Sequence, residues 1–383
     1  MLAFRPVASS SLSLPSGSYI YSLAAALPGL SLAAISSDDS LRLFDVRSLQ
    51  VVSVTAGSTH ENGVTTLTEY SGVGTEPGLL VTGGRDGKVR LWDVRSASGK
   101  PMLEMTTAKN AAVLSLACRA ETNFIVAGTE LVSSQAAVVF WDIRSPRDHR
   151  LQYVESHNDD VTELQFHPTQ ESVLLSGSTD GLVNVYDMTI TDEDDAVLQV
   201  INHGSIHHAG FLSEHAIYTL SHDESFSIHP TTDPDNTAQG PGPIRFGDLR
   251  QHLSCEYVVQ TLTSGQGTHL AAGNTTEKRL DLVPLMPNPQ WQFDQSNVSR
   301  LLGAHGEEII RSLYLDEQWG SIFTCGEDGL VRAWKPDDAS AGQDDQGAAH
   351  QEEAVTSNTK MPQAKKDRKK PKDEKRFRPY HIK

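Results

Sequence analysis

Short runs of alternating apolar and polar residues recur along this chain, and each run ends in an aromatic residue that Asp usually follows. The clearest run is TGGRDGKVRLWD at 82–93, and near copies stand at 176–187 (SGSTDGLVNVYD) and 324–335 (TCGEDGLVRAWK). An alternation of period two predicts β-strands, and Asp-Gly predicts a tight turn between them, because Gly adopts the positive φ that such turns need. Each run is therefore predicted to form two antiparallel strands.

The aromatic positions mark a repeat with the period of a four-stranded sheet. Weaker copies end at Phe44 and Trp141, and two degenerate copies fit between the last pair of clear ones. In chain order the markers are Phe44, Trp92, Trp141, Tyr186, His229, Val283 and Trp334. Their spacing suits the ~40 to 45 residues of a propeller blade. We therefore expect an all-β, seven-bladed propeller over residues 1–336, in which ring closure protects the sheet edges.

The first residues are expected to complete this ring. Residues 1–37 contain Arg5 and no acid, but one basic residue is too few for a mitochondrial leader. We expect residues 1–10 to form the outer strand of the last blade and residues 19–45 to build the first blade. The apolar stretch 23–35 is interrupted by Pro-Gly and is shorter than the ~20 residues of a membrane span, so no membrane segment is expected.

Cysteine and histidine patterns favour neither a disulfide framework nor a metal centre. Cys118, Cys255 and Cys325 are far apart and lack CxxC spacing, which favours a reducing compartment. A dense group of histidines has no cysteine nearby and no acidic cluster at metal spacing; its members are His203, His207, His208, His215 and His222. The sequence has no phosphate-binding glycine loop and no nucleophile elbow. We expect no cofactor, no metal, no small-molecule substrate and no enzyme activity.

The repeat resembles that of the WD-repeat family over nearly all of residues 1–336. The resemblance implies that each full blade contains a hydrogen-bonded tetrad of His, Ser or Thr, Asp and Trp, so that the His-Asp pairs are structural rather than catalytic. The tetrads carried over are His60, Thr82, Asp86 and Trp92; His157, Ser176, Asp180 and Tyr186; and His305, Thr324, Asp328 and Trp334. The fifth blade keeps His203, Thr219 and Asp223 but has His229 at the aromatic position.

Three connections depart from the repeat or extend it. In the third blade, GTELVSSQAAVVFW has a turn about four residues longer than that of the second blade and lacks the tetrad Asp. This turn is a candidate contact loop, and tolerated drift at a surface turn explains it equally well. The acidic or Pro/Gly-rich stretches 191–197 and 231–243 are expected to be solvated connections.

Arginine follows the aromatic-Asp pair in three consecutive copies, FDVR, WDVR and WDIR. These motifs place Arg47, Arg95 and Arg144 at equivalent positions. Consecutive WDxR motifs resemble the adaptor-docking motif of propellers that act as substrate receptors of cullin-type ubiquitin ligases. The alternative is that arginine at this position is a solvated residue, as it frequently is in the WD-repeat family.

Charge is divided unevenly along the chain. Residues 365–383 hold ten basic residues and three acids, a charge of +7, which leaves −24 on residues 1–364. We expect 337–359 to be an acidic, polar, disordered linker and 360–383 a basic, disordered tail. The basic residues of the tail are Lys365, Lys366, Arg368, Lys369, Lys370, Lys372, Lys375, Arg376, Arg378 and Lys383.

The tail resembles a nuclear import signal, and its RFRPY segment is similar to the tails of nucleolar and ribosome-assembly factors. A solubilising charged terminus is the alternative. The resulting hypothesis is a non-catalytic, nuclear or nucleolar protein-interaction scaffold in a multiprotein complex, with ribosome assembly as a candidate process and the cytoplasm as the second choice of location. Two alternatives remain: a ubiquitin-ligase substrate receptor, and an RNA-associated protein whose tail binds phosphates weakly.

Overall fold

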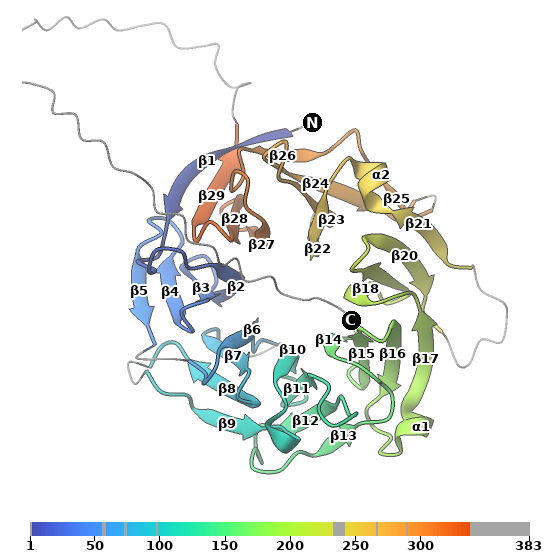
Figure 1. Cartoon of the computed structure of the whole chain (residues 1–383). Helices are drawn as coiled ribbons and strands as arrows, with labels where there is room; N and C mark the ends of the chain where they lie inside the picture. The colour runs from blue at the N-terminus through green and yellow to red at the C-terminus, as the bar shows by residue number, and fades with distance from the viewer. Residues whose placement is uncertain are drawn as a thin grey trace, which may run out of the picture. The chain divides into compact units, whose positions relative to one another are not determined.

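The computed structural model describes residues 2–55, 59–72, 75–96, 99–232, 242–265, 267–288 and 290–337. These residues form seven blades of mainly antiparallel strands around a central axis (Figure 1); five blades are separate sheets, and two are joined in one sheet. The predicted all-β, seven-bladed propeller is confirmed. The predicted basic tail, and the predicted linker beyond Asp337, lie outside the described residues.

The first five blades are separate four-stranded sheets, and in each the chain runs from the innermost strand outward. Their strands are β2 (Ile20–Leu27), β3 (Ser31–Ser36), β4 (Leu41–Asp45) and β5 (Val51–Val54); β6 (Val64–Glu69), β7 (Leu79–Gly84), β8 (Lys88–Asp93) and β9 (Leu103–Thr106); β10 (Val113–Arg119), β11 (Phe124–Thr129), β12 (Val138–Asp142) and β13 (Leu151–Tyr153); β14 (Val161–Phe166), β15 (Val173–Ser178), β16 (Leu182–Asp187) and β17 (Val197–Asn202); and β18 (Ile206–Ser213), β19 (Ala216–Ser221), β20 (Ser225–Pro230) and β21 (Ile244–Asp248).

Blades 6 and 7 are joined into one sheet by β1 (Leu2–Ser10). The other strands of this sheet are β22 (Tyr257–Ser264), β23 (Gly267–Asn274), β24 (Arg279–Met286), β25 (Gln292–Phe293), β26 (Ser299–Leu302), β27 (Ile310–Asp316), β28 (Ser321–Gly326) and β29 (Val331–Pro336). The short helices among the described residues are a 3-10 turn (Ala108–Asn110), α1 (Glu193–Ala196) and α2 (Leu249–Leu253).

The ring closes through the N-terminal strand, as the sequence predicted. β1 pairs antiparallel with β29, the third strand of blade 7, from Phe4 opposite Pro336 to Ser10 opposite Val331. Its first residues also pair in parallel with β26 of blade 6. The two ends of the propeller are therefore held in one blade, and the backbone groups at the outer edge of β29 are paired rather than left open.

The seven marker positions occupy one equivalent place in the third strand of each blade. Each marker lies opposite an aliphatic residue of the second strand, which confirms the degenerate copies in blades 5 and 6. The pairs are Phe44 with Leu32, Trp92 with Leu80, Trp141 with Ile125, Tyr186 with Leu174, His229 with Ile217, Val283 with Leu270, and Trp334 with Ile322.

A second repeat signal lies in the innermost strands. Each begins with, or carries immediately after its first residue, a buried Val or Ile, and the register of each shifts just after this residue, as a β-bulge does. These residues are Ile20, Val64, Val113, Val161, Ile206, Val258 and Ile310. We did not predict this marker from the sequence, although it is present in all seven blades.

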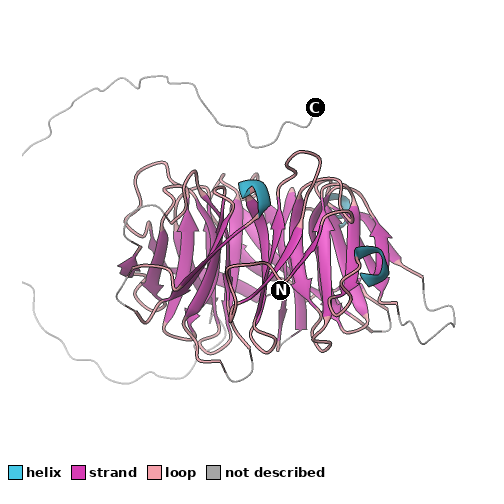
Figure 2. Ribbon diagram, turned by 90° about the horizontal axis from the view of Figure 1, so that it is seen from below, coloured by secondary structure: helices cyan, strands magenta, loops and turns pink. Residues whose placement is uncertain are grey.

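The apolar core is divided among the blade interfaces. Seven clusters of buried residues are found, and each combines residues from two neighbouring blades. Both faces of every sheet are therefore covered by its neighbours, which is why second strands such as β3, β15 and β28 are buried along their whole length. The strands cross the thickness of the ring, and the connections gather on its two faces (Figure 2).

We name the two faces by their connections. The turn face carries the turns between second and third strands and the connections from one blade to the next. The arginine face carries the turns between first and second strands and the connections between third and fourth strands. Because third strands run in the same direction in every blade, the residues that follow them emerge on one face.

Candidate functional site

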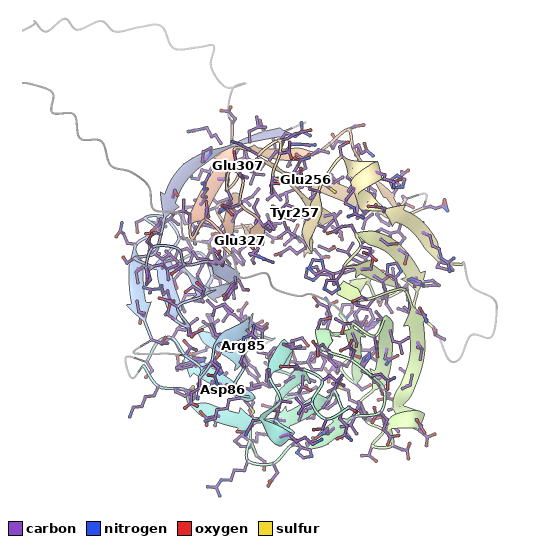
Figure 3. All side chains as sticks on the ribbon, in the orientation of Figure 1. Arg85, Asp86, Glu256, Tyr257, Glu307 and Glu327 are labelled. Atoms are coloured by element: carbon purple, nitrogen blue, oxygen red, sulfur yellow. The ribbon has the colours of Figure 1, made fainter. Side chains whose placement is uncertain are left out.

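The predicted tetrad of blade 2 is assembled at the turn face. His60 Nδ1 lies 2.8 Å from Asp86 Oδ1, and His60 Nε2 lies 2.8 Å from Thr82 Oγ1. The Trp92 indole donates to the same Thr82 oxygen at 2.9 Å. We assign the Nδ1–H tautomer to His60, because each donor then meets an acceptor. Asp86 and its neighbour Arg85 lie between β7 and β8, where the Gly87 turn begins (Figure 3).

Blades 7 and 4 bring their predicted residues together in the same way. His305 lies 2.7 Å from both Asp328 and Thr324, and the Trp334 indole donates to Thr324 at 2.9 Å. In blade 4 the corresponding distances are 3.1 Å from His157 to Asp180 and 2.7 Å from His157 to Ser176. Tyr186 replaces the tryptophan, and its hydroxyl lies 3.1 Å from Ser176 Oγ.

These Asp-His-hydroxyl chains have the connectivity of a catalytic triad but the wrong surroundings. Thr82, Ser176 and Thr324 are fully buried. Each hydroxyl also has an indole or phenol partner inside the blade. Burial raises the pKa of Asp328, but the interactions with His305, the Leu330 N–H and Arg332 together outweigh burial and lower the pKa. The carboxylate is thus held charged for a structural contact, with no exposed nucleophile beside it.

The fifth blade corrects the sequence prediction. Asp223 is exposed, and its contact among the described residues is a backbone carbonyl that accepts from Arg250. Ser227 takes the central place instead: its hydroxyl lies 3.1 Å from His203, 2.8 Å from His229 and 2.8 Å from Thr219. The sequence feature that indicates this arrangement is a serine at the strand position opposite Thr219. The tetrad pattern does not include this position.

Glu224 is the unusual residue of this blade. It has a φ of 59° where Gly87, Gly181 and Gly329 have 69°, 92° and 71°, so a side chain stands where the repeat has none. The side chain turns inward, is 7% exposed, and accepts a hydrogen bond from Val258 N of blade 6 at 3.3 Å. Burial raises the pKa of Glu224 to about 7, against the opposing effects of that bond, Arg250 and His208.

Blades 1 and 6 use ion pairs in place of the tetrad. In blade 1, Arg42 is 9% exposed and contacts Asp38 at 2.6 Å. The same Asp-x-x-x-Arg spacing pairs Asp86 with Arg90 and Asp328 with Arg332, a sequence signal that the repeat analysis missed. In blade 6 the charge order is reversed: the buried Asp281 contacts Arg279 and, at 2.7 Å, Arg300.

The extended turn of blade 3 is fixed to its neighbours. Val132 pairs with Gln135 across Ser133 and Ser134, both at positive φ, as in a two-residue hairpin turn. Leu131 N donates to Asp160 at 2.8 Å, and Lys109 donates to Gln135 at 3.0 Å. The candidate contact loop therefore spans the connections on both sides of blade 3, which gives it a structural role.

Part of the acidic stretch 191–197 also differs from the expected solvated connection. It forms the single-turn helix α1, capped by Asp192. The Glu193 carboxylate accepts from the backbone N–H groups of Val154, Glu155 and Ser156 at 2.7, 2.8 and 2.6 Å. This acid closes the connection between blades 3 and 4. In the stretch 231–243, residues 233–241 lie outside the described residues.

Polar side chains on the inner strands bond to the backbone of the following blade. Ser115 donates to Val161 O at 2.8 Å, and Gln260 both donates to and accepts from Leu313. Tyr257, at the start of β22, accepts from Ile310 N at 2.9 Å (Figure 3). These bonds tie the bulged ends of neighbouring inner strands together.

Two members of the histidine group, His207 and His208, belong to this inner seam. His208 lies 2.5 Å from Glu163 of blade 4 and 3.0 Å from Val259 O of blade 6, and so links three blades. His207 stacks on His222 with ring centroids 5.1 Å apart, and burial lowers the pKa of His207 to about 3. Within the described ranges, no group of three or more His, Cys, Asp or Glu residues is placed to hold a metal ion.

The three candidate arginines lie on the arginine face but differ in their contacts. Arg95 contacts its own Asp93 at 2.8 Å and Glu76 at 2.6 Å, while Arg144 contacts its own Asp142 at 2.5 Å. Hydrogen bonding to Arg144 lowers the pKa of Asp142 to about 2.

Arg47 instead stacks on Trp319 of blade 7, with its guanidinium carbon 4.5 Å from the ring centroid. The side chains of Arg95 and Arg144 remain 41% and 65% exposed. A partner on this face would meet these two arginines already braced by carboxylates.

These features define a seven-bladed β-propeller with WD-type tetrads. Residues 52–93 and 149–187 match the WD domain, G-beta repeat model. Both segments start before the first strand of their blade and end with its aromatic-Asp pair. Each sequence repeat therefore begins before the first strand of its blade and ends at the third strand of that blade. The outer strand of the blade belongs to the next repeat, so consecutive repeats share a blade.

An uncharacterized WD repeat-containing protein of Schizosaccharomyces pombe is 33% identical over 297 residues, 75% of this chain and 86% of the relative. One of Saccharomyces cerevisiae is 37% identical over 259 residues, 67% of this chain and 64% of the relative, so just under two thirds of that protein is matched. The chain belongs to the WD-repeat family.

Two further relatives come from Dictyostelium discoideum. The WD repeat-containing protein 89 homolog of Dictyostelium discoideum is 24% identical over 314 residues, which are 79% of each chain. A nuclear pore complex protein, nup43, of the same organism is 32% identical over 108 residues, 28% of this chain and 24% of that protein. None of the described helices is long and apolar enough to span a membrane.

The tetrads generate a stability prediction. Asp328→Ala or Asp86→Ala removes the acceptor of a buried histidine, and each is expected to lower the free energy of unfolding by about 1 to 3 kcal/mol. Urea denaturation measures the change. Asp223→Ala is the matched control, since this exposed Asp occupies the corresponding turn without a tetrad contact. The tetrad assignment is wrong if the two tetrad variants unfold with the control.

Glu224 generates a pH prediction. Its folded-state pKa of about 7 lies above the ordinary value of 4.5, so the neutral form is favoured in the folded state, and the stability it contributes is lost as pH rises through 7. Glu224→Gln should therefore leave stability unchanged near pH 4 and raise it by about 1 to 3 kcal/mol at pH 8. Urea unfolding at both pH values, beside Asp223→Asn, tests this. An equal effect at the two pH values would contradict it.

Proposed function

We propose that this protein is a non-catalytic scaffold of a nuclear multiprotein complex. The observation that carries the proposal is the use of the His-Asp pairs: they are buried and bonded to hydroxyls within the blades, so they serve the fold. WD-repeat propellers are generally non-catalytic interaction scaffolds, and binding by such proteins falls to the loops and faces of a rigid ring.

The charge distribution supports a nuclear role. Residues 1–364 carry −24 and residues 365–383 carry +7, so the part of the chain before the tail favours basic partners and the tail favours phosphate-rich ones. The partial similarity to a nuclear pore protein agrees with membership of a nuclear complex. Ribosome assembly is the process to test first, because the RFRPY tail is similar to those of assembly factors.

Affinity purification from nuclear extract tests the scaffold proposal. Ribosomal precursors and the cullin-ligase adaptor are scored in the same purification. Recovery of a defined complex by the full chain, retained after RNase treatment, supports a protein scaffold. Recovery that disappears with RNase favours the RNA-associated alternative, and recovery of no partner contradicts the scaffold.

The tail has its own prediction. Deleting residues 360–383 should shift a fluorescently tagged protein from the nucleus to the cytoplasm, because it removes both basic clusters of the tail. The melting temperature should stay the same, since the described blades end with β29 at Pro336. Replacing the same residues with an unrelated import signal is the control and should restore nuclear accumulation. Nuclear retention of the deletion would contradict the import role.

A second candidate function, substrate receptor of a cullin-type ligase, is favoured by one observation. Arg95 and Arg144 follow equivalent strands of adjacent blades and expose their guanidinium groups on the same face.

Arg95→Asp combined with Arg144→Asp should then abolish copurification of the ligase adaptor by reversing the charge at both contacts. Lys100→Asp with Arg147→Asp, on the same face but outside the WDxR motif, is the matched control. If wild-type protein recovers no adaptor, the ligase hypothesis is rejected.

A further inference from the structure

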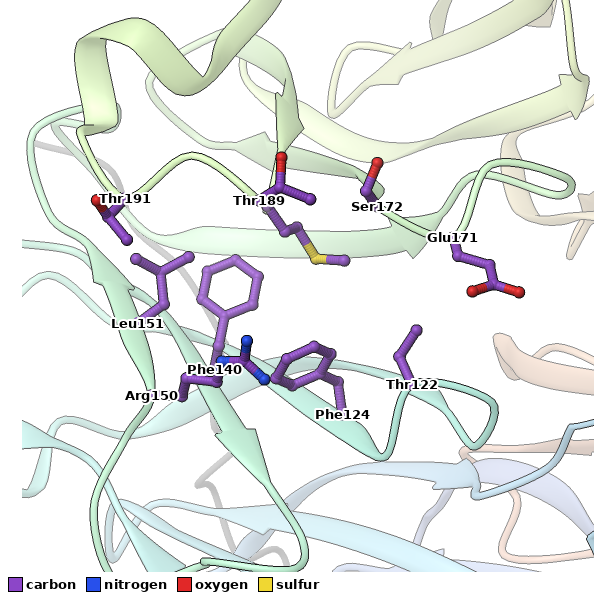
Figure 4. Close-up of a pocket in the computed structure, with 10 residues that line it drawn as sticks. Thr122, Phe124, Phe140, Arg150, Leu151, Glu171, Ser172, Thr189 and Thr191 are labelled. Carbon is purple, nitrogen blue, oxygen red and sulfur yellow. The ribbon is translucent and has the colours of Figure 1, made fainter.

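An open pocket of about 360 Å³ lies between blades 3 and 4 (Figure 4). Phe124 and Phe140 come from neighbouring strands of blade 3, Leu151 begins its outer strand, and Met188 follows the third strand of blade 4. Phe124, Leu151 and Met188 are half-buried and provide its accessible apolar surface, over the fully buried Phe140. Hydroxyl groups surround them, from Thr122, Ser172, Thr189 and Thr191.

The pocket is the outer part of the blade 3–4 core. Neighbouring blades diverge as they leave the ring axis, so the space between them widens. Tyr153 fills the inner part, stacked on Tyr186 at 5.0 Å and edge-on to Phe140 at 5.3 Å. Beyond these rings the apolar side chains are only half-buried, so a partner's apolar group placed there would complete the core.

Charged side chains of opposite sign line the pocket. The Arg150 guanidinium lies over the Phe124 ring at 5.1 Å from its centroid and is 3.9 Å from Asp142, whose carboxylate is already bound by Arg144. The Arg150 side chain is 61% exposed.

Glu171 lies across the pocket from Arg150 (Figure 4). Its carboxylate is exposed and makes no hydrogen bond or ion pair with any described residue. Arg119 is the cation near Glu171, and its guanidinium is occupied by the backbone carbonyls of His167 and Gln170. The pocket thus has an exposed carboxylate at one end, from Glu171, and an exposed guanidinium group at the other, from Arg150.

We propose that this pocket binds a short extended segment of a partner protein, in which one bulky apolar side chain is flanked by a basic and an acidic residue. The apolar group contacts Phe124, Leu151 and Met188, the basic residue meets Glu171, and the acidic residue meets Arg150. Alternate residues of an extended chain point the same way, which gives the pattern Lys-x-Leu-x-Asp or its reverse. Charge placement fixes the direction of the bound chain. The proposal specifies a partner class for the scaffold function and rests on it.

Fluorescence anisotropy with four labelled peptides tests the pocket. The first peptide is Gly-Ser-Lys-Thr-Leu-Thr-Asp-Ser-Gly, and the second has Lys and Asp exchanged. The other two are the same peptides with Ser in place of Leu, and they serve as controls without the apolar side chain. We expect one charge order to bind the full-length protein at least tenfold more tightly than the other, and the Leu-to-Ser change to weaken it at least tenfold.

The double variant Arg150→Glu with Glu171→Lys reverses both charges without changing the net charge, and it should invert the preferred peptide. Lys278→Glu with Glu307→Lys exchanges the charges of an exposed ion pair on the turn face and should change nothing. Thermal unfolding of both variants verifies that the fold is retained.

The proposal is overturned if neither charge order binds at 1 mM peptide, if the Leu-to-Ser change has no effect, or if the double variant keeps the wild-type preference. Purification of complexes with the same double variant separates this result from the scaffold function. A variant that has lost peptide selectivity but still recovers the full complex retains the scaffold function without this pocket. A wild-type protein that recovers no complex contradicts the scaffold itself, whatever the peptides do.

Discussion

The pairing of β1 with β29 is the constraint on which the rest of the structure depends. Each sheet has both faces covered by neighbouring blades, and the apolar core is divided into seven interfaces rather than gathered in one centre. An unclosed array would expose one whole apolar face at each end as well as the edge of β29. The strand contributed by the first ten residues removes both costs, so blades far apart in sequence depend on one another.

Within this ring, the buried turn of each blade must have its polar groups satisfied, and the blades meet this requirement with different chemistry. Blades 2, 4 and 7 use a tetrad centred on a hydroxyl, blade 5 moves the hydroxyl to Ser227, and blades 1 and 6 use arginine-carboxylate pairs. An unpaired group at any of these places would cost about 1 to 3 kcal/mol. The requirement is common to these blades, and the residue types are free to vary.

Different residues of the propeller stabilise the fold and remain available for binding. Histidine, aspartate and hydroxyl side chains that resemble catalytic groups are held inside the blades, and inner-strand side chains such as Gln260 and Ser115 join one blade to the next. The groups left available for partners lie on the faces and at the outer ends of the blade interfaces. The braced arginines of blades 2 and 3 and the pocket beside Arg150 are two such places on neighbouring parts of the ring.

The sequence alone determined the repeat, the number of blades, the closing strand and three full tetrads, because these follow from local strand patterns and residue spacing. Tertiary structure decided where a side chain could reach. Asp223 has the tetrad spacing yet points to solvent, while Glu224 beside it is buried, since Ser227 already satisfies His203. Glu193 looks like a solvated acid until three backbone N–H groups from another blade converge on it. The pocket exists because two blades diverge, and no local sequence pattern records the space between two neighbouring sheets.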